Sequence, residues 1–425
     1  MAAADFSFHG LLRAGDHIVC GQSSAEPLTL TRKLVAEGAG VAPLTLFLGS
    51  TLSRTFDGEL PEGMRFLSYA ALGRNAALAD RGLLEVIPER YSRVMQMFTN
   101  GAIQADIVLI QLAPGAGGRP HSMGLAHDYT VDSARCARLV IAELNADMPW
   151  THGAELPPDI HIDHWVQANE PPLTIPPAKI GDVERAIGAH VAALVPNGAT
   201  LQAGVGSLPD AVLKQLHFHR DLGFHSGVFG DAAGQLVQCG AITNARKGID
   251  AGISVCNTVS GSADLYKWVH ENPTVNVLSG RYTHAASVIA QISCLHAVNS
   301  ALEVDLTGQV NSESVGGRKL GGIGGLLDFC HAARQSATGG RAITVLPSTA
   351  DGGMQSRIVV SLEGNPATVG RGEVDVVVTE FGVADLRQAT LTQRAERLIA
   401  IAAPQFREEL LYLWRKSTWG KRAWH

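Results

Sequence analysis

The stretch GFHSGVFGD at residues 223–231 places an imidazole, a hydroxyl and a carboxylate close together in the chain. It follows TLQAGVGSLPDAVL (200–213), where a strand-like run ends in a tight glycine turn. Enzymes with α/β folds often carry their chemistry on such segments, because a rigid scaffold positions them. Residues 223–231 are therefore a candidate catalytic loop, in which His225 and Asp231 are the obvious functional groups.

The glycine turn QAGVGSLP (202–209) is a second candidate for chemistry. Gly204 and Gly206 end a predicted strand, and Pro209 stands near the first turn of a predicted helix. Such a turn exposes backbone N–H groups and a helix N-terminus, which suit an anion or an oxyanion. Pro209 replaces the third glycine of the G-x-G-x-x-G pattern, so a dinucleotide site is disfavoured. A purely structural turn is the alternative.

The segment VGGRKLGGIGGLLDF (315–329) is unusually rich in glycine and contains Arg318 and Lys319. Glycines allow a ligand to approach the backbone closely, and the two cations suit phosphate groups. The alternative is a flexible loop. The pairs of histidines at 161–165 and 216–220 lack metal-ligand spacing, so we expect no metal site there. The sequence has no G-x-S-x-G motif, which disfavours a serine α/β-hydrolase.

Composition limits the class of protein. The chain has 425 residues, of which 46% are hydrophobic and 17% charged, so we expect a well-packed protein of two or three domains. Its net charge is −6 without a basic block, which disfavours nucleic-acid binding. No apolar run approaches the roughly 18 residues of a membrane span. Six scattered cysteines and an N-terminus unlike a signal peptide predict reduced thiols and a cytoplasmic location.

Short β-branched runs alternate with helical patterns, which predicts an α/β fold with mainly parallel sheets. Strands are expected at 16–22, 43–49, 105–113, 199–206, 342–347 and 373–382, and helices at 27–38, 131–145, 181–195 and 392–416. The proline-rich segment 154–179 is interpreted as an extended linker. It divides the chain into an N-terminal α/β domain, residues 1–165, and a C-terminal α/β domain, residues 180–425, which carries the glycine-rich loops.

The two halves resemble each other in sequence pattern. Residues 15–30 and 198–213 both read strand, small-residue turn, proline and helix, and 104–114 resembles 373–383. We therefore expect two similar open α/β domains, with a cleft between the carboxyl ends of their strands. The alternative is that any two strand–helix units look alike.

In chain order, these motifs resemble the acetyl-CoA hydrolase/transferase family, which includes 4-hydroxybutyrate and butyrate–acetate CoA-transferases. The similar segments span nearly the whole chain: AEP, QADIVLIQLAP, LQAGVGSLPDAVL, GAITNARKG, DLTGQVNSESVGG, GGIGGLLDF, LPSTA, SRIV, VDVVVTEFGVADLR and APQFREEL. The resemblance implies two CoA-transferase-like domains with the active site between them, and a homodimer. It also implies transfer of CoA from an acyl-CoA to a small carboxylic acid without ATP. CoA is then a co-substrate, and no permanently bound cofactor is expected.

The resemblance also implies roles for individual residues. CoA is expected to contact the glycine turn and the glycine-rich loop, and the substrate to contact Gln22, His225 and Gly227. The residues that would bind CoA are Gly204, Val205, Gly206, Ser207, Leu208, Gly321 and Gly325.

The sequence departs from the family at the nucleophile. The family's glutamate falls in a segment of the form H-[ST]-E-x-F-x-D, whereas this chain has HSGVFGD, with Gly227 at the glutamate position. A carboxylate from elsewhere could replace it, and Glu26 is the leading candidate. Other candidates are Glu59, Glu62 and Glu313. Asp231 could act as base or nucleophile, although a structural role is the competing interpretation.

We expect a CoA-transferase with a relocated carboxylate. An acyl-CoA hydrolase, or an inactive acyl-CoA-binding protein or partner subunit, is the alternative. Because Gly227 has no side chain, the acyl site is also expected to suit a bulkier or dicarboxylic acid.

Overall fold

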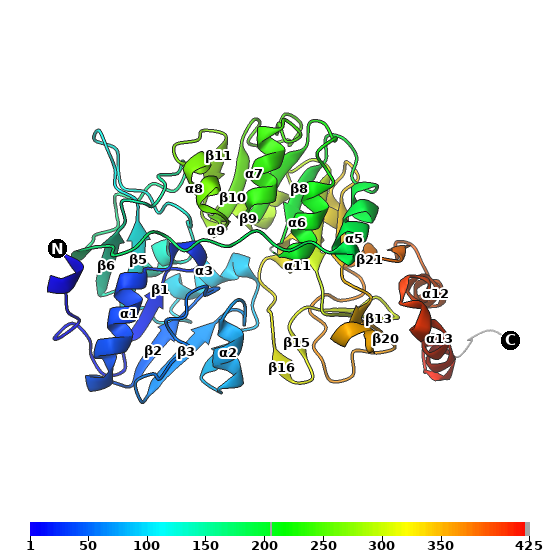
Figure 1. Ribbon diagram of the computed structural model, residues 1–425, viewed down its shortest axis with the longest axis horizontal. Coiled ribbons are helices and arrows are strands. Elements are labelled where there is room, and N and C mark those ends of the chain that lie inside the picture. The colour runs from blue at the N-terminus through cyan, green and yellow to red at the C-terminus, as the bar shows by residue number, and fades with distance from the viewer. Residues whose placement is uncertain (205, 421–425) are drawn as a thin grey trace.

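The computed structural model describes residues 1–204 and 206–420, which build two large β-sheets flanked by helices (Figure 1). The first sheet is parallel throughout and has the order β4-β3-β2-β1-β5-β6-β7. Its strands are β1 (His17–Cys20), β2 (Leu44–Phe47), β3 (Met64–Ser68), β4 (Leu84–Val86), β5 (Ile107–Leu112), β6 (Leu139–Leu144) and β7 (His164–Gln167).

The second sheet has the order β11-β10-β9-β8-β12-β17-β21-β22, and β22 is its antiparallel edge. Its strands are β8 (Thr200–Ala203), β9 (Gly223–Phe229), β10 (Ser254–Val259), β11 (Val275–Val277), β12 (Leu295–Ser300), β17 (Arg341–Val345), β21 (Val376–Thr379) and β22 (Gly382–Asp385). Minor strands are β13 (Glu303–Asp305), β14 (Val310–Asn311), β15 (Ser314–Val315), β16 (Arg318–Lys319), β18 (Thr349–Ala350), β19 (Gln355–Ser356) and β20 (Ile358–Val359).

The two sheets share one winding pattern. In each, the first strand is central, the next three strands add on one side, and later strands add on the other. This places the segments 15–30 and 198–213 at equivalent positions, as predicted. The second predicted match, of 104–114 with 373–383, is wrong. β5 is the direct neighbour of the central strand β1, whereas β12 and β17 separate β21 from the central strand β8. Both segments are buried parallel strands, and such strands are alike in being apolar throughout.

Of the four predicted helices, two are confirmed, one is divided into two helices, and one is wrong. They are α1 (Leu28–Glu37), α2 (Asn75–Asp80), α3 (Tyr91–Thr99), α4 (Thr130–Ala134), α5 (Asp182–Ala192), α6 (Ser207–Lys214), α7 (Asp231–Gln238), α8 (Ala263–Val269), α9 (Gly280–Thr283), α10 (Ala286–Ile289), α11 (Leu326–Gln335), α12 (Leu391–Ile401) and α13 (Arg407–Lys416). The helices predicted at 27–38 and 181–195 are confirmed as α1 and α5. The helix predicted at 392–416 is divided into α12 and α13, since the chain turns at Ala402–Ala403 before Pro404.

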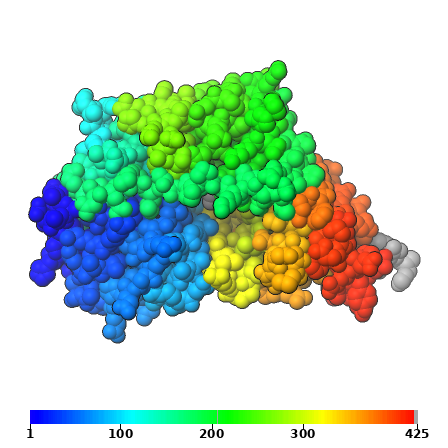
Figure 2. Space-filling model, in the orientation of Figure 1, coloured from blue at the N-terminus to red at the C-terminus, as the bar shows by residue number. Residues whose placement is uncertain are grey.

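The prediction of one helix over 131–145 is wrong. Only α4 forms there, and the following apolar run becomes β6, an inner strand that pairs with β5 and β7. The predicted linker at 154–179 is also partly wrong, because β7 lies within it as the edge strand of the first sheet. The remainder, 168–181, runs extended across the molecule to α5, and it lies on the surface in the face that Figure 2 shows.

The halves are joined by more than the linker. One continuous apolar core contains buried side chains of both sheets, such as Val19 and Val108 from the first and Leu201 and Val298 from the second. Smaller cores lie under the first sheet and between α12, α13 and the nearby strands.

All six cysteines are free thiols: Cys20, Cys256 and Cys330 are buried, Cys294 is half-buried, and Cys136 and Cys239 are exposed. Among the described residues, every helix is too short or too polar to cross a bilayer.

Candidate functional site

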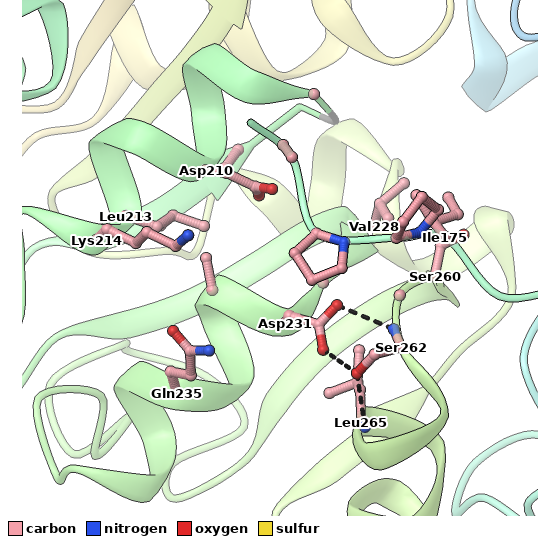
Figure 3. A pocket seen from close by; sticks show the side chains of 18 of the residues that line it. Ile175, Asp210, Leu213, Lys214, Val228, Asp231, Gln235, Ser260, Ser262 and Leu265 are labelled. Carbon is pink, nitrogen blue, oxygen red and sulfur yellow. Dashed lines mark hydrogen bonds between the residues drawn. The ribbon is translucent and has the colours of Figure 1, made fainter. Parts of the chain in front are cut away.

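The carboxyl ends of β8, β9 and β10 surround a pocket of about 450 Å³ (Figure 3). Its wall includes backbone after each of these strands, at Gly204, Gly230 and Gly261, and the linker residues 175–178 also line it. Asp210 and Lys214 from α6 and Gln235 from α7 supply polar side chains to the lining. The glycine turn therefore borders this pocket at the carboxyl ends of the strands, where open α/β sheets bind ligands.

Asp231 is the first residue of α7 and lies at the edge of this pocket. Its carboxylate accepts hydrogen bonds from the backbone N–H of Ser262 at 3.0 Å and from the Ser262 hydroxyl at 2.5 Å. The same hydroxyl accepts from the N–H of Leu265 and so caps α8. Asp231 therefore has a clear structural contact that joins the starts of two helices.

His225 and Gly227 alternate with the pocket-lining Phe224 and Val228 along β9, so they lie on the other face of the strand. His225 is fully buried, and its Nε2 donates to the carbonyl of Thr283 at 2.9 Å. Burial and nearby Lys247 lower the pKa of His225 to about 4, so the ring is neutral at physiological pH. The family resemblance predicts that His225 contacts the substrate. In the structure its ring nitrogen Nε2 is bonded to the Thr283 carbonyl.

Gly227 lies against His284, which follows α9. A Cβ atom at residue 227 would stand 3.1 Å from Nε2 and 3.3 Å from Cε1 of His284. Sequence reasoning missed His284, because its segment YTHAAS has no spacing or neighbouring acid that marks a functional histidine.

A buried hydrogen-bonded network connects Gln22, which follows β1, to the strand beside Gly227. The Tyr69 hydroxyl donates to Oε1 of Gln22 at 2.8 Å, and Nε2 of Gln22 donates to the Tyr91 hydroxyl at 3.1 Å. Tyr91 then donates to Oδ1 of Asn257 at 2.8 Å. Asn257 is in β10, between residues paired with Ser226 and Val228 of β9, and so lies next to Gly227. The network therefore links Gln22 in the first half with the strand region of Gly227 in the second.

Glu26 is buried, with 2% of its surface exposed, and lies between β1 and α1. Its Oε1 accepts from the hydroxyls of Ser53 at 2.6 Å and Thr31 at 3.4 Å. Its Oε2 is buried and has no partner among the described residues. Burial raises the pKa of the Glu26 carboxyl, although the Ser53 and Thr31 bonds oppose this effect. These contacts belong to the first half, and no direct hydrogen bond joins Glu26 to β9 in the described part of the chain.

The other candidate glutamates are placed differently. Glu59 and Glu62 are exposed in the loop before β3. Glu313 is half-buried and its Oε1 accepts from the Thr368 hydroxyl at 2.8 Å.

The glycine-rich loop approaches protein groups very closely. Its carbonyls at Gly321 and Gly324 accept from the backbone N–H groups of Ala71 and Tyr91 in the first half, both at 2.9 Å. A Cβ at Gly325 would lie 2.6 Å from Nε2 of His284. The backbone of this loop therefore contacts the first half directly, and Gly325 leaves room for His284 within the second half.

Arg318 and the residues of the glycine turn, which the sequence suggested for ligand binding, lie in separate elements. Arg318, one of the two cations suited to phosphate groups, pairs at the surface with Asp80 of α2, with a shortest contact of 2.7 Å. Gly206 precedes α6, which begins with Ser207 and the buried Leu208, whereas Val205 lies outside the described residues.

Within residues 1–204 and 206–420, no group of three or more His, Cys, Asp or Glu side chains is arranged to hold a metal ion. What distinguishes the site is instead a set of glycine turns, a buried polar network and two neutral histidines around β9.

Comparisons with known proteins agree with this architecture. Residues 261–412 match the acetyl-CoA hydrolase/transferase C-terminal domain. The chain is 38% identical to the 4-hydroxybutyrate coenzyme A transferase of Clostridium kluyveri over 405 residues, which are 94% of each chain. The crystal structure of RipA from Yersinia pestis matches with a TM-score of 0.89 and 31% identity, covering 95% of this chain and 94% of that one.

The solved 4-hydroxybutyrate CoA-transferase of Porphyromonas gingivalis matches with a TM-score of 0.79 and 32% identity, over 95% of this chain and 94% of that one. More distantly, 347 residues are 25% identical to the acetyl-CoA hydrolase of Eremothecium gossypii, covering 74% of this chain and 64% of that protein. Sequence and fold thus agree over nearly the whole length, and the chain belongs to the acetyl-CoA hydrolase/transferase family.

Proposed function

We propose that this chain transfers CoA from an acyl-CoA thioester to a free carboxylic acid without ATP. The observation that carries the proposal is the 38% identity to a CoA transferase over 94% of both chains. The glycine turn after β8 and the loop at 321–325 support it, because each leads into the N-terminus of a helix, α6 or α11, and such helix ends favour an anion or an oxyanion. We assign CoA contacts to Gly204, Gly206, Ser207, Leu208, Gly321 and Gly325.

The chemistry needs a carboxylate that attacks the thioester, and residue 227 is glycine. In the ordinary sequence of steps, attack by a carboxylate forms an acyl anhydride and releases CoA thiolate, which returns to the other carbonyl carbon. We propose that this carboxylate comes from outside position 227. Among the chain's own acids Glu26 is the candidate, since its Oε2 has no hydrogen-bond partner and its carboxylate no salt bridge in the described part of the chain. Asp231 is the second candidate, although Ser262 occupies both of its oxygens.

Three further features belong to the proposal. The chain works as two domains, 1–165 and 180–425, with the substrate between them near Gln22, His225 and Gly227. It acts in the cytoplasm, and it assembles as a homodimer.

The alternative is an acyl-CoA hydrolase, which the glycine at position 227 favours because water could enter where a nucleophile is missing. The two activities leave different products. A transferase makes a new CoA ester, whereas a hydrolase makes only free CoA and acid.

Incubation of the protein with a panel of acyl-CoAs and free acids, followed by mass spectrometry of the CoA esters, is expected to reveal new esters without ATP. Borohydride reduction during turnover and peptide mapping then locate any glutamyl thioester, with Glu26 as the expected position if the chain supplies the carboxylate. Formation of free CoA alone would replace the transferase by a hydrolase. Binding without turnover would reduce the protein to an acyl-CoA binder.

A further inference from the structure

The space beside Gly227 is open on the side where a side chain would begin. Apart from the adjoining chain, a Cβ there would meet only two described atoms within 4 Å, Nε2 and Cε1 of His284. Gly227 itself is half-buried, so solvent reaches part of this position. Nε2 of His284 therefore faces the place where a side chain of residue 227 would begin.

The imidazole of His284 is held firmly in this orientation. Its ring centroid lies 4.7 Å from that of Tyr91 and 5.1 Å from that of Phe329, and only 4% of the residue is exposed. His225 fixes the preceding backbone by donating to the Thr283 carbonyl. In the described part of the chain, no hydrogen bond reaches Nε2 of His284.

The hydrogen bonds assign the proton of the ring. Nδ1 of His284 is 2.8 Å from the hydroxyl of Thr283, which has one other neighbour, the Ser279 carbonyl at 3.4 Å. We assign the hydroxyl proton to Nδ1, because that contact is the shorter one and the Ser279 carbonyl already accepts two backbone N–H groups, at 2.8 and 3.0 Å. A neutral imidazole carries one N–H, which is then on Nε2. Burial lowers the pKa of His284 to about 3, so the ring is neutral at physiological pH.

The N-terminus of α11 lies beside Nε2 of His284. Gly325 is the residue before α11, a helix of ten residues, and its missing Cβ would be 2.6 Å from Nε2 of His284. The free backbone N–H groups of a helix N-terminus favour negative charge. A neutral imidazole donor at such a helix end is a known way to polarise a carbonyl or to hold an oxyanion.

We propose that Nε2 of His284 and the N-terminus of α11 bind the carboxylate of the acceptor acid beside Gly227, and that this substrate carboxylate attacks the thioester itself. The inference rests on the proposed CoA transfer and supplies the carboxylate that residue 227 lacks. His284 is then a catalytic residue that positions the attacking acid.

The steps balance without an enzyme ester. A carboxylate oxygen of the acceptor attacks the acyl carbon, the C–S bond breaks, and CoA leaves as thiolate. The product is a mixed anhydride of the two acids. The thiolate then attacks the acceptor's carbonyl carbon, the C–O bond to that carbon breaks, and the donor acid leaves as its carboxylate. No proton is gained or lost overall.

The mechanism requires both substrates to be bound together. Initial rates measured at varied butyryl-CoA and acetate, or varied acetyl-CoA and succinate, are expected to give intersecting double-reciprocal lines. The usual covalent route gives parallel lines, because it is a ping-pong reaction. Borohydride with acyl-CoA in the absence of acceptor is expected to label no carboxyl side chain. Parallel lines, or a label on Glu26, would overturn the proposal.

Single substitutions at His284 and Gly227 test the acceptor-binding site, and a substitution at a distant histidine serves as the control. His284→Ala removes a hydrogen bond to a charged group and is expected to raise the KM for the acceptor acid roughly 10- to 100-fold, with the KM for acyl-CoA unchanged. Gly227→Ala puts a methyl group 3.1 Å from Nε2 of His284, obstructs the approach of a carboxylate, and is expected to act in the same direction. The exposed His161 provides the matched control, and His161→Ala is expected to match the wild type. An unchanged acceptor KM in His284→Ala would exclude the subsite.

A failure of the proposed function is recognised separately. If the wild type forms no new CoA ester, the attack step is wrong, and calorimetry with acetate or succinate in the presence of CoA decides the subsite alone. Binding to the wild type but not to His284→Ala supports it, and equal binding by both proteins overturns it.

Discussion

At the scale of single residues, the pKa values of ionisable groups near the site depend more on burial than on the sequence motif in which each group lies. Asp128 is 1% exposed, and its Oδ1 accepts from the N–H and hydroxyl of Thr130 at 2.9 and 2.6 Å. Its Oδ2 is buried without a partner in the described part of the chain. Burial raises the pKa of Asp128 from 3.8 to about 6, because the interior penalises the charged form.

The raised pKa of Asp128 predicts that replacing its carboxyl by a neutral amide stabilises the folded protein more at neutral pH than at acidic pH. The folded state keeps the Asp128 proton up to a higher pH than the unfolded state, so this group's contribution is fully present below pH 3.8 and lost as the pH rises to about 6. Asp128→Asn keeps the Oδ1 acceptor and cannot ionise. Relative to the wild type, its free energy of unfolding is expected to rise by roughly 1–3 kcal/mol between pH 4 and pH 7.

Urea unfolding across that pH range measures the effect. The exposed Asp264 is the control for a surface carboxylate, since Asp264→Asn is expected to change the free energy of unfolding much less than Asp128→Asn does. Parallel stability curves for Asp128→Asn and the wild type would contradict the raised pKa.

The residues of the candidate site were only partly predictable. Gly227 was singled out through the family resemblance, which implies a glutamate at this position of the HSGVFGD segment. His284 could not be found, since its importance comes from the approach of α9 to β9 and from a missing Cβ atom. Whether Gln22, His225, Glu26 and Asp231 act on substrate stays a prediction.

At the scale of the elements, hydrogen bonds between helix starts shape the rim of the pocket. Asp231 at the start of α7 holds Ser262, and Ser262 caps α8 (Figure 3). The strands β1, β2, β5, β8, β17 and β21 were predicted, because buried parallel strands are continuous apolar runs. The same property caused the error at 131–145, where an apolar run fits a buried helix or a buried strand equally well. The interpretation of residues 223–231 as a loop is wrong, because residues 223–229 form β9.

Asp231→Ala is expected to lower the free energy of unfolding by about 1–3 kcal/mol, because it leaves the half-buried Ser262 N–H and hydroxyl without their acceptor. Asp231→Asn keeps one acceptor oxygen and is expected to cost less. Chemical denaturation measures both, with Asp264→Ala in the first turn of α8 as the control. If both variants unfold like the wild type but lose CoA transfer, the role of Asp231 is chemical instead of structural.

At the scale of the whole molecule, the two sheets are bound together by interior contacts. They share one apolar core, and backbone hydrogen bonds from Ala71 and Tyr91 reach the glycine loop of the other half. The duplicated winding could be inferred from the paired strand–turn–helix segments. The contact between the halves could not, because it depends on side chains such as Tyr91 and Asn257 that no local pattern connects.

The linker is therefore expected to be dispensable for holding the halves together. Residues 176, 177, 179 and 181 are exposed, so a protease-recognition sequence inserted after Lys179 should be cut in the folded protein. The two fragments are expected to elute together in native gel filtration and to separate in urea. Separate elution in native buffer would mean that the shared core is too weak to hold them.

The distribution of thiols makes the relative position of the halves directly observable. Cys136 is exposed in the first half and Cys239 in the second, whereas Cys20, Cys256 and Cys330 are buried. Buried thiols react slowly with maleimides, so a donor and an acceptor dye can be attached to the unaltered chain at the two exposed positions. The protein thus carries its own pair of attachment points for energy-transfer spectroscopy, which can follow the distance between its halves as ligands are added.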